Sequence, residues 1–167
     1  MSLRALKMRH SNQTKQTKGT FMQSLRHSSA IEIAKELDQF KRKWNRISQI
    51  FQENAELWHK IAPQHFSGML AITPAKPGDT RLFATTLGNK EFAIGLTSRV
   101  LNGDICGRIT ASLLDHTGKP KTLVCEAFIN ADGQILSTDG EKLIDMYESD
   151  SPGYRLLAEI VYKVISF

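Results

Sequence analysis

The run SAIEIAKELDQFKRKWNRISQIFQENAELWHKIAP, residues 29–63, decides the fold. Its apolar residues recur at alternating spacings of three and four, the period of one face of an α-helix. Ser29 and Glu32 form a capping-box pattern at its start, and Pro63 predicts its end. We therefore expect one helix over residues 29–62, about 50 Å long. The repeating positions are Ala30, Ile33, Leu37, Phe40, Trp44, Ile47, Phe51, Asn54, Trp58 and Ile61.

This helix has two interpretations. The heptad spacing fits the seam of a coiled coil, in which Asn54, the one polar member of the series, would set the register. Two Trp and two Phe side chains are bulky for a dimeric zipper, however. We therefore favour a helix laid across a β-sheet.

After Pro63 the sequence changes to short runs that are rich in β-branched and aromatic residues. Turn residues separate these runs, and the connections are short enough for an antiparallel meander of five or six strands. The predicted strands are residues 66–73, 80–87, 90–98, 105–114, 121–130 and, most weakly, 134–137.

The C-terminal part of the chain is predicted to be helical. Residues 141–147 fit a short helix, and Ser151 with Pro152 fits the N-cap and first position of a longer one. Apolar residues at helical spacing between Leu156 and Ile165 predict that this last helix is amphipathic. The predicted fold class is therefore α+β: a long N-terminal helix packed on a five- to six-stranded antiparallel meander sheet, closed by a C-terminal helical segment over 141–166.

Alternation along the predicted strands separates two faces of the sheet. Large residues form the face expected under the long helix, and smaller, half-polar residues form the other face. That second face meets solvent, receives another sheet in a dimer, or lines a shallow ligand cavity. The large set is Phe66, Leu70, Ile72, Phe83, Leu87, Phe92, Ile94 and Leu96; the small set is Ser67, Ala71, Thr73, Ala84, Thr86, Ala93, Gly95 and Thr97.

Charge divides the chain at Glu32, its first acidic residue. The 31 residues before it hold six basic ones, which leaves 16 of the 22 Lys and Arg residues against all 17 Asp and Glu residues in the rest. The pI of about 9.3 therefore belongs to the N-terminal segment. We expect residues 1–28 to form a basic, weakly structured arm and residues 29–167 to form a single domain.

The basic arm predicts an anionic partner, most plausibly nucleic acid, because clustered cations bind phosphate through counterion release. Arg42 and Arg46 add two cations on one face of the long helix, where an ordinary solvated ion-pair face with Asp38 is the simpler interpretation. No motif for sequence-specific readout accompanies them. The candidate nucleic-acid-binding residues are Arg4, Lys7, Arg9, Lys15, Lys18, Arg26, Arg42 and Arg46.

The same arm has a targeting interpretation, since mitochondrial presequences are also basic and free of acidic residues. No run of apolar residues is long enough for a membrane helix, and the N-terminus lacks the apolar core of a secretory signal. We therefore expect a cytoplasmic protein, or an organelle-targeted one if residues 1–28 are a presequence.

Metal, cofactor and catalytic signals are weak. The two cysteines, Cys106 and Cys125, have no CxxC partner and lie in neighbouring predicted strands, where the register keeps their sulfurs apart. Arg108 and Glu126 are placed for a cross-strand ion pair, which stabilises register more often than it performs acid-base chemistry. We expect no metal and no cofactor, and an enzyme less readily than a binding protein.

Two loops resemble loop segments of the hot-dog-fold acyl-thioester proteins. They are residues 74–80 (PAKPGDT) and 115–119 (DHTGK), twelve residues together. The resemblance implies a sheet wrapped around a long helix, a dimer, and binding or processing of an acyl thioester. The chain departs from that pattern because its helix ends close to the first strand and a further strand lies between the loops. No position matches the family's catalytic carboxylate.

Two classes of function follow. The first is a non-enzymatic interaction protein, dimeric, whose basic arm contacts an anionic partner. The second is a domain that binds or processes a small ligand or acyl thioester. The second class predicts a continuous apolar pocket with a few polar groups, whereas the first predicts a flat or self-paired surface.

Overall fold

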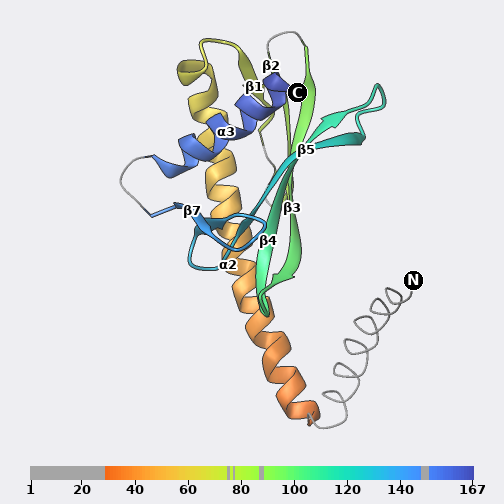
Figure 1. Ribbon diagram of the computed structural model, residues 1–167, viewed down its shortest axis with the longest axis vertical. Helices are drawn as coiled ribbons and strands as arrows, with labels where there is room; N and C mark the ends of the chain where they lie inside the picture. The colour runs from red at the N-terminus through yellow and green to blue at the C-terminus, as the bar shows by residue number, and fades with distance from the viewer. Residues whose placement is uncertain (1–28, 75, 77, 87–88, 148–150) are drawn as a thin grey trace, which may run out of the picture. The chain divides into compact units, whose positions relative to one another are not determined.

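The computed structural model describes residues 29–74, 76, 78–86, 89–147 and 151–167 (Figure 1). It divides the chain into two units, Met1–Gln39 and Phe40–Phe167. The predicted arm, residues 1–28, lies outside the described residues. Of the first unit, only the start of a long helix is described.

That helix is α2 (Ala30–His65). Its predicted capping box is confirmed, because the Glu32 backbone N–H donates to Ser29 Oγ at 3.2 Å and the Ser29 N–H donates to Glu32 Oε2 at 2.7 Å. The predicted end at Pro63 is wrong, since the helix continues to His65. Proline lacks only its own N–H, so the last turn accommodates Pro63, and the Phe66 N–H still reaches the Ala62 carbonyl at 3.2 Å.

Seven strands follow, each antiparallel to the next in sequence order, in one sheet. This confirms the α+β class and the meander, with one strand more than the predicted five or six. The first strand is shorter than predicted because Phe66 and the two residues after it form a turn. The strands are β1 (Leu70–Ile72), β2 (Arg81–Thr86), β3 (Glu91–Leu101), β4 (Asp104–Leu114), β5 (Pro120–Ile129), β6 (Gln134–Leu136) and β7 (Lys142–Asp145).

The additional strand replaces the short helix that was predicted for residues 141–147. In β7, Ile144 pairs with Ile135 of β6 and is buried, while Lys142 and Leu143 are exposed. Cross-strand pairing buries both isoleucines, whereas a helix of seven residues is too short to be stable by itself, which explains the outcome. The helical segment at the C-terminus is therefore only α3 (Pro152–Ser166).

We call the side of the sheet that carries α2 and α3 the helix face, and the opposite side the outer face. Six of the large residues predicted for the helix face are buried, but Phe83 is 42% exposed. The parity predicted for β2 is wrong, because Leu82 pairs with Ile94 and Ala84 pairs with Phe92. Leu82, Ala84 and Thr86 therefore belong to the helix face and Phe83 to the outer face. Leu87 lies outside the described residues.

Helix α2 comes close to the sheet at Gly107 of β4. A Cβ atom at this position would stand 2.6 Å from Ile47 Cγ2, 2.6 Å from Leu96 Cδ1 and 2.9 Å from Ile129 Cγ2. Glycine is therefore required for the helix to approach β4 this closely. Around this crossing α2 buries Ile47, Ile50, Phe51, Ala55, Trp58 and Ala62.

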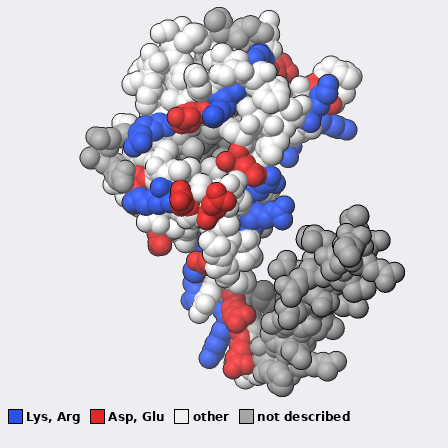
Figure 2. All heavy atoms as spheres, viewed as in Figure 1, with Lys and Arg blue, Asp and Glu red and all other residues white. Residues whose placement is uncertain are grey.

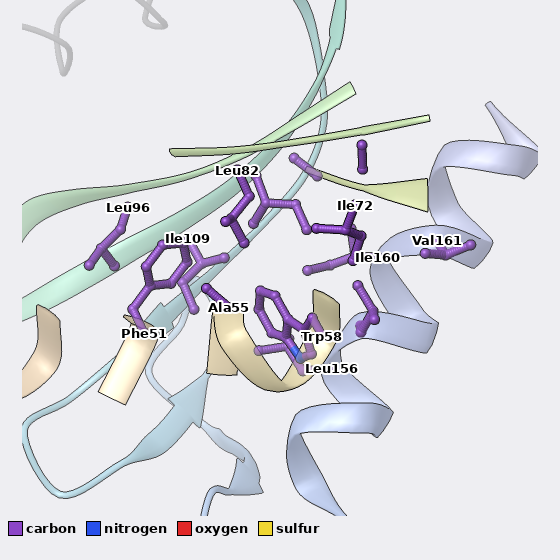
Figure 3. Close-up of a cluster of buried hydrophobic side chains, with 14 of the residues drawn as sticks. Phe51, Ala55, Trp58, Ile72, Leu82, Leu96, Ile109, Leu156, Ile160 and Val161 are labelled. Carbon is purple, nitrogen blue, oxygen red and sulfur yellow. The ribbon is translucent and has the colours of Figure 1, made fainter. Parts of the chain in front are cut away.

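The core joins both helices to the helix face of the sheet. Figure 3 shows Phe51, Ala55 and Trp58 of α2 between the strands and α3. Phe51 and Trp58 pack edge to face, with ring centroids 6.2 Å apart. From α3, Leu156, Leu157, Ile160, Val161 and Val164 complete the same core.

Within the described ranges, every helix is too short or too polar to cross a lipid bilayer.

Candidate ligand-binding cleft

Helix α3 is fixed to the rest of the domain at both ends. Near its start, Trp58 Nε1 of α2 donates a buried hydrogen bond to the Gly153 carbonyl at 2.7 Å. A Cβ atom at Gly153 would collide with Asn54 of α2, so glycine permits this contact. At its end, Lys90 Nζ donates to the carbonyls of Val164 at 3.3 Å and Ile165 at 3.0 Å, where a cation also suits the helix dipole.

The start of α3 differs from its prediction in one respect. Ser151 occupies the N-cap position and Pro152 the first helical position, as expected. Ser151 has a left-handed backbone with φ 50°, however, and its side chain makes no capping hydrogen bond. The first turn is instead held by Tyr154, whose ring packs on His65 and Phe66 at centroid distances of 5.2 and 5.7 Å.

A cleft of about 650 Å³ lies between α3 and strands β4 to β7, on the helix face. Small side chains from three elements leave this space open: Ala111 of β4, Ala127 of β5 and Ala158 of α3. The larger lining residues include Ile109, Cys125, Ile135, Leu143, Ile144, Tyr154, Leu156, Ile160 and Tyr162.

The cleft is apolar at its floor and open at its mouth. Ile135 and Ile109 at the floor are 1% and 3% exposed, whereas Leu143 and Tyr162 at the mouth are 54% and 66% exposed. Figure 2 shows charged side chains of both signs on either side of a mostly uncharged hollow on this face. The accessible part is therefore the layer above the isoleucines, where a guest would remove apolar surface from water.

Charged residues line one rim of the cleft at helical spacing. Arg155, Glu159 and Lys163 follow one another at intervals of four along α3, and all three are exposed. Neither cation has an ion-pair partner among the described residues. The rim thus offers two cations and one carboxylate to an occupant of the cleft.

Cys125 lies in the wall of the cleft and is half-buried. Burial raises the pKa of its thiol above the ordinary value for cysteine. The Lys163 charge and a backbone hydrogen bond from Ala111 oppose this rise, and Glu159 adds to it. Burial likewise raises the pKa of Cys106. Both cysteines are free, and Ala111 rather than Cys106 faces Cys125, which confirms the predicted separation.

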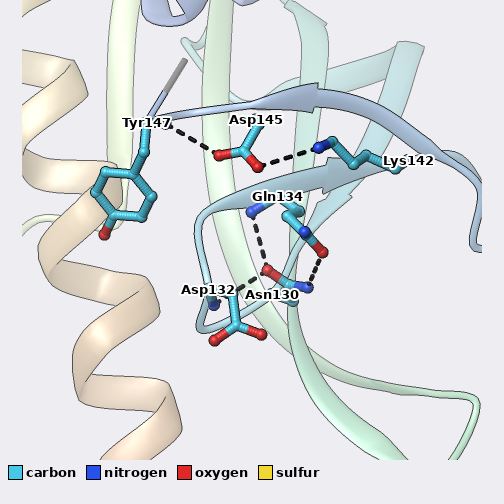
Figure 4. Close-up of polar contacts among 6 residues, drawn as sticks. All are labelled: Asn130, Asp132, Gln134, Lys142, Asp145 and Tyr147. Carbon is cyan, nitrogen blue, oxygen red and sulfur yellow. Dashed lines mark hydrogen bonds and ion pairs between the residues drawn. The ribbon is translucent and has the colours of Figure 1, made fainter.

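The wall formed by β6 and β7 is fixed by polar contacts (Figure 4). Asn130 Oδ1 accepts the backbone N–H groups of Asp132 at 3.1 Å and Gln134 at 2.9 Å, and Asn130 Nδ2 donates to Gln134 Oε1 at 3.0 Å. Asp145 accepts the Tyr147 N–H at 3.1 Å and pairs with Lys142 at 3.1 Å. These two contacts lower the pKa of Asp145, the Tyr147 N–H having the larger effect.

Only Arg42 and Arg46 of the residues predicted for nucleic-acid binding lie among the described residues. The six in the arm (Arg4, Lys7, Arg9, Lys15, Lys18 and Arg26) lie outside the described residues. Arg42 and Arg46 are both exposed on α2. Arg46 hydrogen-bonds to the hydroxyl of Tyr147 and, at 3.5 Å, to Gln49 Oε1, so part of its guanidinium is already engaged. The cleft and the arginines of α2 are thus separate features.

The outer face of the sheet carries a smaller hollow of about 200 Å³. Small residues of the predicted set, Ala93, Gly95 and Thr97, line it together with Thr110 and Ser112 of β4. On the same face, Arg108 pairs with Glu126 of β5, as predicted, with Arg108 Nε donating to Glu126 Oε2 at 2.6 Å. The negative charge of the Glu126 carboxylate is therefore balanced by Arg108.

The described part of the chain contains no group of three His, Cys, Asp or Glu side chains that would hold a metal ion. The cleft itself was not predicted by sequence reasoning, which placed a ligand cavity on the small-residue face. Its one sequence signal is the alanine at position 158 within the apolar face of α3.

No protein-family model, no curated protein and no solved structure matches this chain.

Proposed function

We propose that the folded part of this chain binds a small apolar ligand in the cleft under α3. The observation that carries the proposal is the cleft of about 650 Å³, which lies within the range of about 300–1,000 Å³ typical of small-molecule sites. Its apolar floor and charged rim match the combination that such sites use for affinity and orientation.

The proposal is for binding rather than catalysis. Cys125 is the nucleophilic side chain in the wall, and its raised pKa keeps it a thiol at neutral pH, whereas a nucleophile needs the thiolate. His65 does not line the cleft, and its ring packs on Tyr154. The acyl-thioester resemblance enters here only as a ligand class, because no position of the sequence matches that family's catalytic carboxylate.

Ligand binding can be tested with the neutral fluorophore N-phenyl-1-naphthylamine, which brightens in apolar surroundings. We expect saturable binding to the wild-type chain and its loss in Ala158→Phe, which fills the cleft. The matched control is Ala71→Phe, which places the same side chain at an exposed position of β1. Equal binding by both variants would place the fluorophore elsewhere.

A second measurement does not depend on how a filled cleft folds. In the wild-type chain, a bound ligand is expected to protect Cys125 from a small maleimide at about pH 8.5. Cys106, which is 3% exposed, serves as the slow internal reference. A labelling rate of Cys125 that stays constant up to saturating fluorophore would refute the proposed site.

The second candidate function belongs to the arm, and the charge distribution favours it. The segment before Glu32 contains six basic residues and no acidic one. Such a segment can bind an anionic partner such as nucleic acid, with Arg42 and Arg46 as further contacts. In the full-length chain, replacing the six by Gln takes the formal net charge from +5 to 5 − 6 = −1. Binding of a single-stranded DNA or RNA fragment should then be lost.

Salt dependence separates this binding from other contacts. If all six cations meet phosphates, the wild-type affinity for a single strand should fall roughly 300-fold between about 50 and 200 mM salt. Arg42→Gln with Arg46→Gln tests the helix separately. Deletion of residues 1–28 should abolish binding, and an unchanged affinity after deletion or Gln replacement would end the arm hypothesis.

We also propose a homodimer in the cytoplasm, with an organelle as the alternative if residues 1–28 act as a presequence. The first 31 residues are basic and free of carboxylates, and the rest of the chain is about neutral. This distribution supports a cytoplasmic and an organelle location equally. Imaging of a C-terminal fluorescent fusion decides between them, because only a presequence makes organelle staining depend on residues 1–28.

A further inference from the structure

The rim of the cleft is not electrically symmetrical, and its asymmetry bears on what the cleft binds. Of the charged residues that line it, Glu126 is paired with Arg108 on the outer face. Arg155, Glu159 and Lys163 remain, so the available rim has a net charge of +1. A guest with a single negative charge complements this rim better than a neutral or cationic one.

The positions of these charges favour one end of the cleft as the place for the negatively charged group of the ligand. Both Lys163 and Glu159 act on the Cys125 thiol in the wall, and the effect of Lys163 is the larger. Of the charged rim residues, Lys163 thus has the largest effect on the wall at Cys125. Lys163 also lies in the last turn of α3, next to the mouth residue Tyr162, where a solvated head group has room.

The floor of the cleft determines the chemistry of the other end of the ligand. Its accessible layer is lined by Cys125, Ala127 and Ala158 above buried isoleucines, and it contains no charged group. An alkyl chain fits such a floor because its burial requires no hydrogen-bond partner. Leu143 and Tyr162 at the mouth continue the apolar surface toward the head group.

Resting on the proposed binding function, we propose that the cleft binds a single-chain amphiphile with a carboxylate head, the chain lying over Ala127 and Ala158 and the carboxylate at Lys163. Glu159 repels the head from the middle of α3 and so sets the direction of the chain. Arg155, at the far end of the same rim, does not contact the carboxylate in this arrangement.

The test uses three probes with the same ten-carbon chain, each below its micelle concentration: decanoate, decanol and decyltrimethylammonium. Titration calorimetry of the full-length wild-type chain is expected to give the tightest binding for decanoate and the weakest for the ammonium. Dodecanoate should bind roughly tenfold more tightly than decanoate, because two further methylenes are buried.

Lys163→Glu identifies the head-group contact. We expect decanoate to bind at least about fivefold more weakly to this variant, decanol to be unaffected, and decyltrimethylammonium to gain. Lys60→Glu changes the net charge by the same amount at an exposed position of α2 outside the cleft, and it should leave all three affinities unchanged. Thermal melting confirms that both variants are folded.

The outcomes separate this inference from the proposed function. If none of the probes binds and none protects Cys125, the binding function itself fails. If decanol and decanoate bind equally and Lys163→Glu changes neither, the cleft binds apolar ligands but the carboxylate assignment is wrong. Tightest binding of the ammonium would assign the head group to Glu159 instead and would equally overturn it.

Discussion

Gly107 shows how a single residue sets the spacing between helix and sheet. The side chains of Ile47, Leu96 and Ile129 converge on the space where a Cβ atom would stand. These three residues come from α2, β3 and β5, so any added atom there pushes on three elements at once. Tightly packed interiors tolerate such overpacking poorly.

We predict that Gly107→Ala lowers the free energy of unfolding by about 1–3 kcal/mol, because the methyl group overpacks the α2 crossing. The matched control is Gly95→Ala, whose Cβ would stand 3.4 Å from Thr110 Oγ1 and 4.0 Å from the Thr80 carbonyl oxygen, both ordinary contacts. Urea unfolding followed by circular dichroism measures both. Equal stability of the two variants would show that the core around Gly107 relaxes freely.

Asp104 connects β4 to α2 through Lys43, with Lys43 Nζ 2.7 Å from Asp104 Oδ1. This hydrogen bond is the main cause that lowers the pKa of Asp104 below 3.8. Because the folded pKa lies below the unfolded one, the stabilisation is present above about pH 4 and is lost as the pH falls through the folded value.

Asp104→Asn should therefore lower the free energy of unfolding at pH 7 by a few tenths of a kcal/mol up to about 1 kcal/mol, since the pair is largely exposed. The difference from wild type should shrink toward pH 2.5. Asp132→Asn is the control, because the Asp132 carboxylate forms no ion pair with the described residues and its replacement should have no such pH dependence. A constant difference across this pH range would contradict the assignment.

At the residue scale, sequence reasoning succeeded where the pairing partner was local. The reciprocal hydrogen bonds of Ser29 and Glu32, and the cross-strand pair of Arg108 and Glu126, were both predicted and confirmed. Phe83 was assigned to the wrong face, because alternation alone does not reveal which parity of a strand faces inward. Leu82 and Phe83 are both large, and only the register with β3 decides between them.

At the scale of elements, α3 depends on two contacts from distant parts of the chain. Trp58 holds its start and Lys90 its end. Together they fix the helix above the sheet and so define the width of the cleft. Any change in these anchors should appear at the cleft as well as in stability.

Trp58→Phe removes the donor to the Gly153 carbonyl while keeping an aromatic ring in the core. We expect a loss of about 1–3 kcal/mol in the free energy of unfolding, because a buried acceptor is left without its partner. Trp44→Phe makes the same substitution at a half-buried position of α2, for which the described residues show no hydrogen bond. A comparable loss at both positions would assign the effect to ring volume rather than to the hydrogen bond.

Helices and strands were predictable where their periodic pattern extended over many residues. The helix over residues 29–62 and the strands β2 to β5 have patterns that extend over several turns or pairs, and all were found, whereas the strand predicted for residues 66–73 was found only as Leu70–Ile72. Strand β7 was missed because Lys142–Asp145 is too short to show a period, and its pairing with β6 is a tertiary contact. The left-handed Ser151 is a loop property without any sequence signal.

At the scale of the whole molecule, the homodimer that we propose could use the outer face of the sheet as its interface. Phe83, Ala93, Ser112 and Leu123 face one another in register across β2, β3, β4 and β5. Phe83 and Leu123 are 42% and 46% exposed at the two ends of this row. The two small residues between them leave a trough that large side chains of a second copy can enter.

If the outer face forms the dimer, sedimentation equilibrium of the full chain should give 2 × 18.8 kDa = 37.6 kDa. Phe83→Ser should shift the mass toward 18.8 kDa, because it removes the largest apolar side chain of the row. Val100→Ser, at a position that is 65% exposed near the end of β3, should remain dimeric. A wild-type chain that stays monomeric at all concentrations would exclude this interface.

The cleft was beyond sequence reasoning for a physical reason. Its alanines lie at positions 111, 127 and 158, on three elements that come together only in the folded state. No spacing along the chain encodes a space that is left between side chains. The charge asymmetry of the first 31 residues, by contrast, is a sum over composition and needs no fold.

The meander also has a consequence for how the domain acquires its structure. Each strand pairs with its neighbour in sequence, so the hairpins close over short distances, whereas Trp58 and Gly153 are 95 residues apart. Closing the longer loop has the higher entropic cost, so α3 is expected to dock after the sheet has formed on α2. Weakening that contact would then leave the folding rate almost unchanged and shorten the lifetime of the native state.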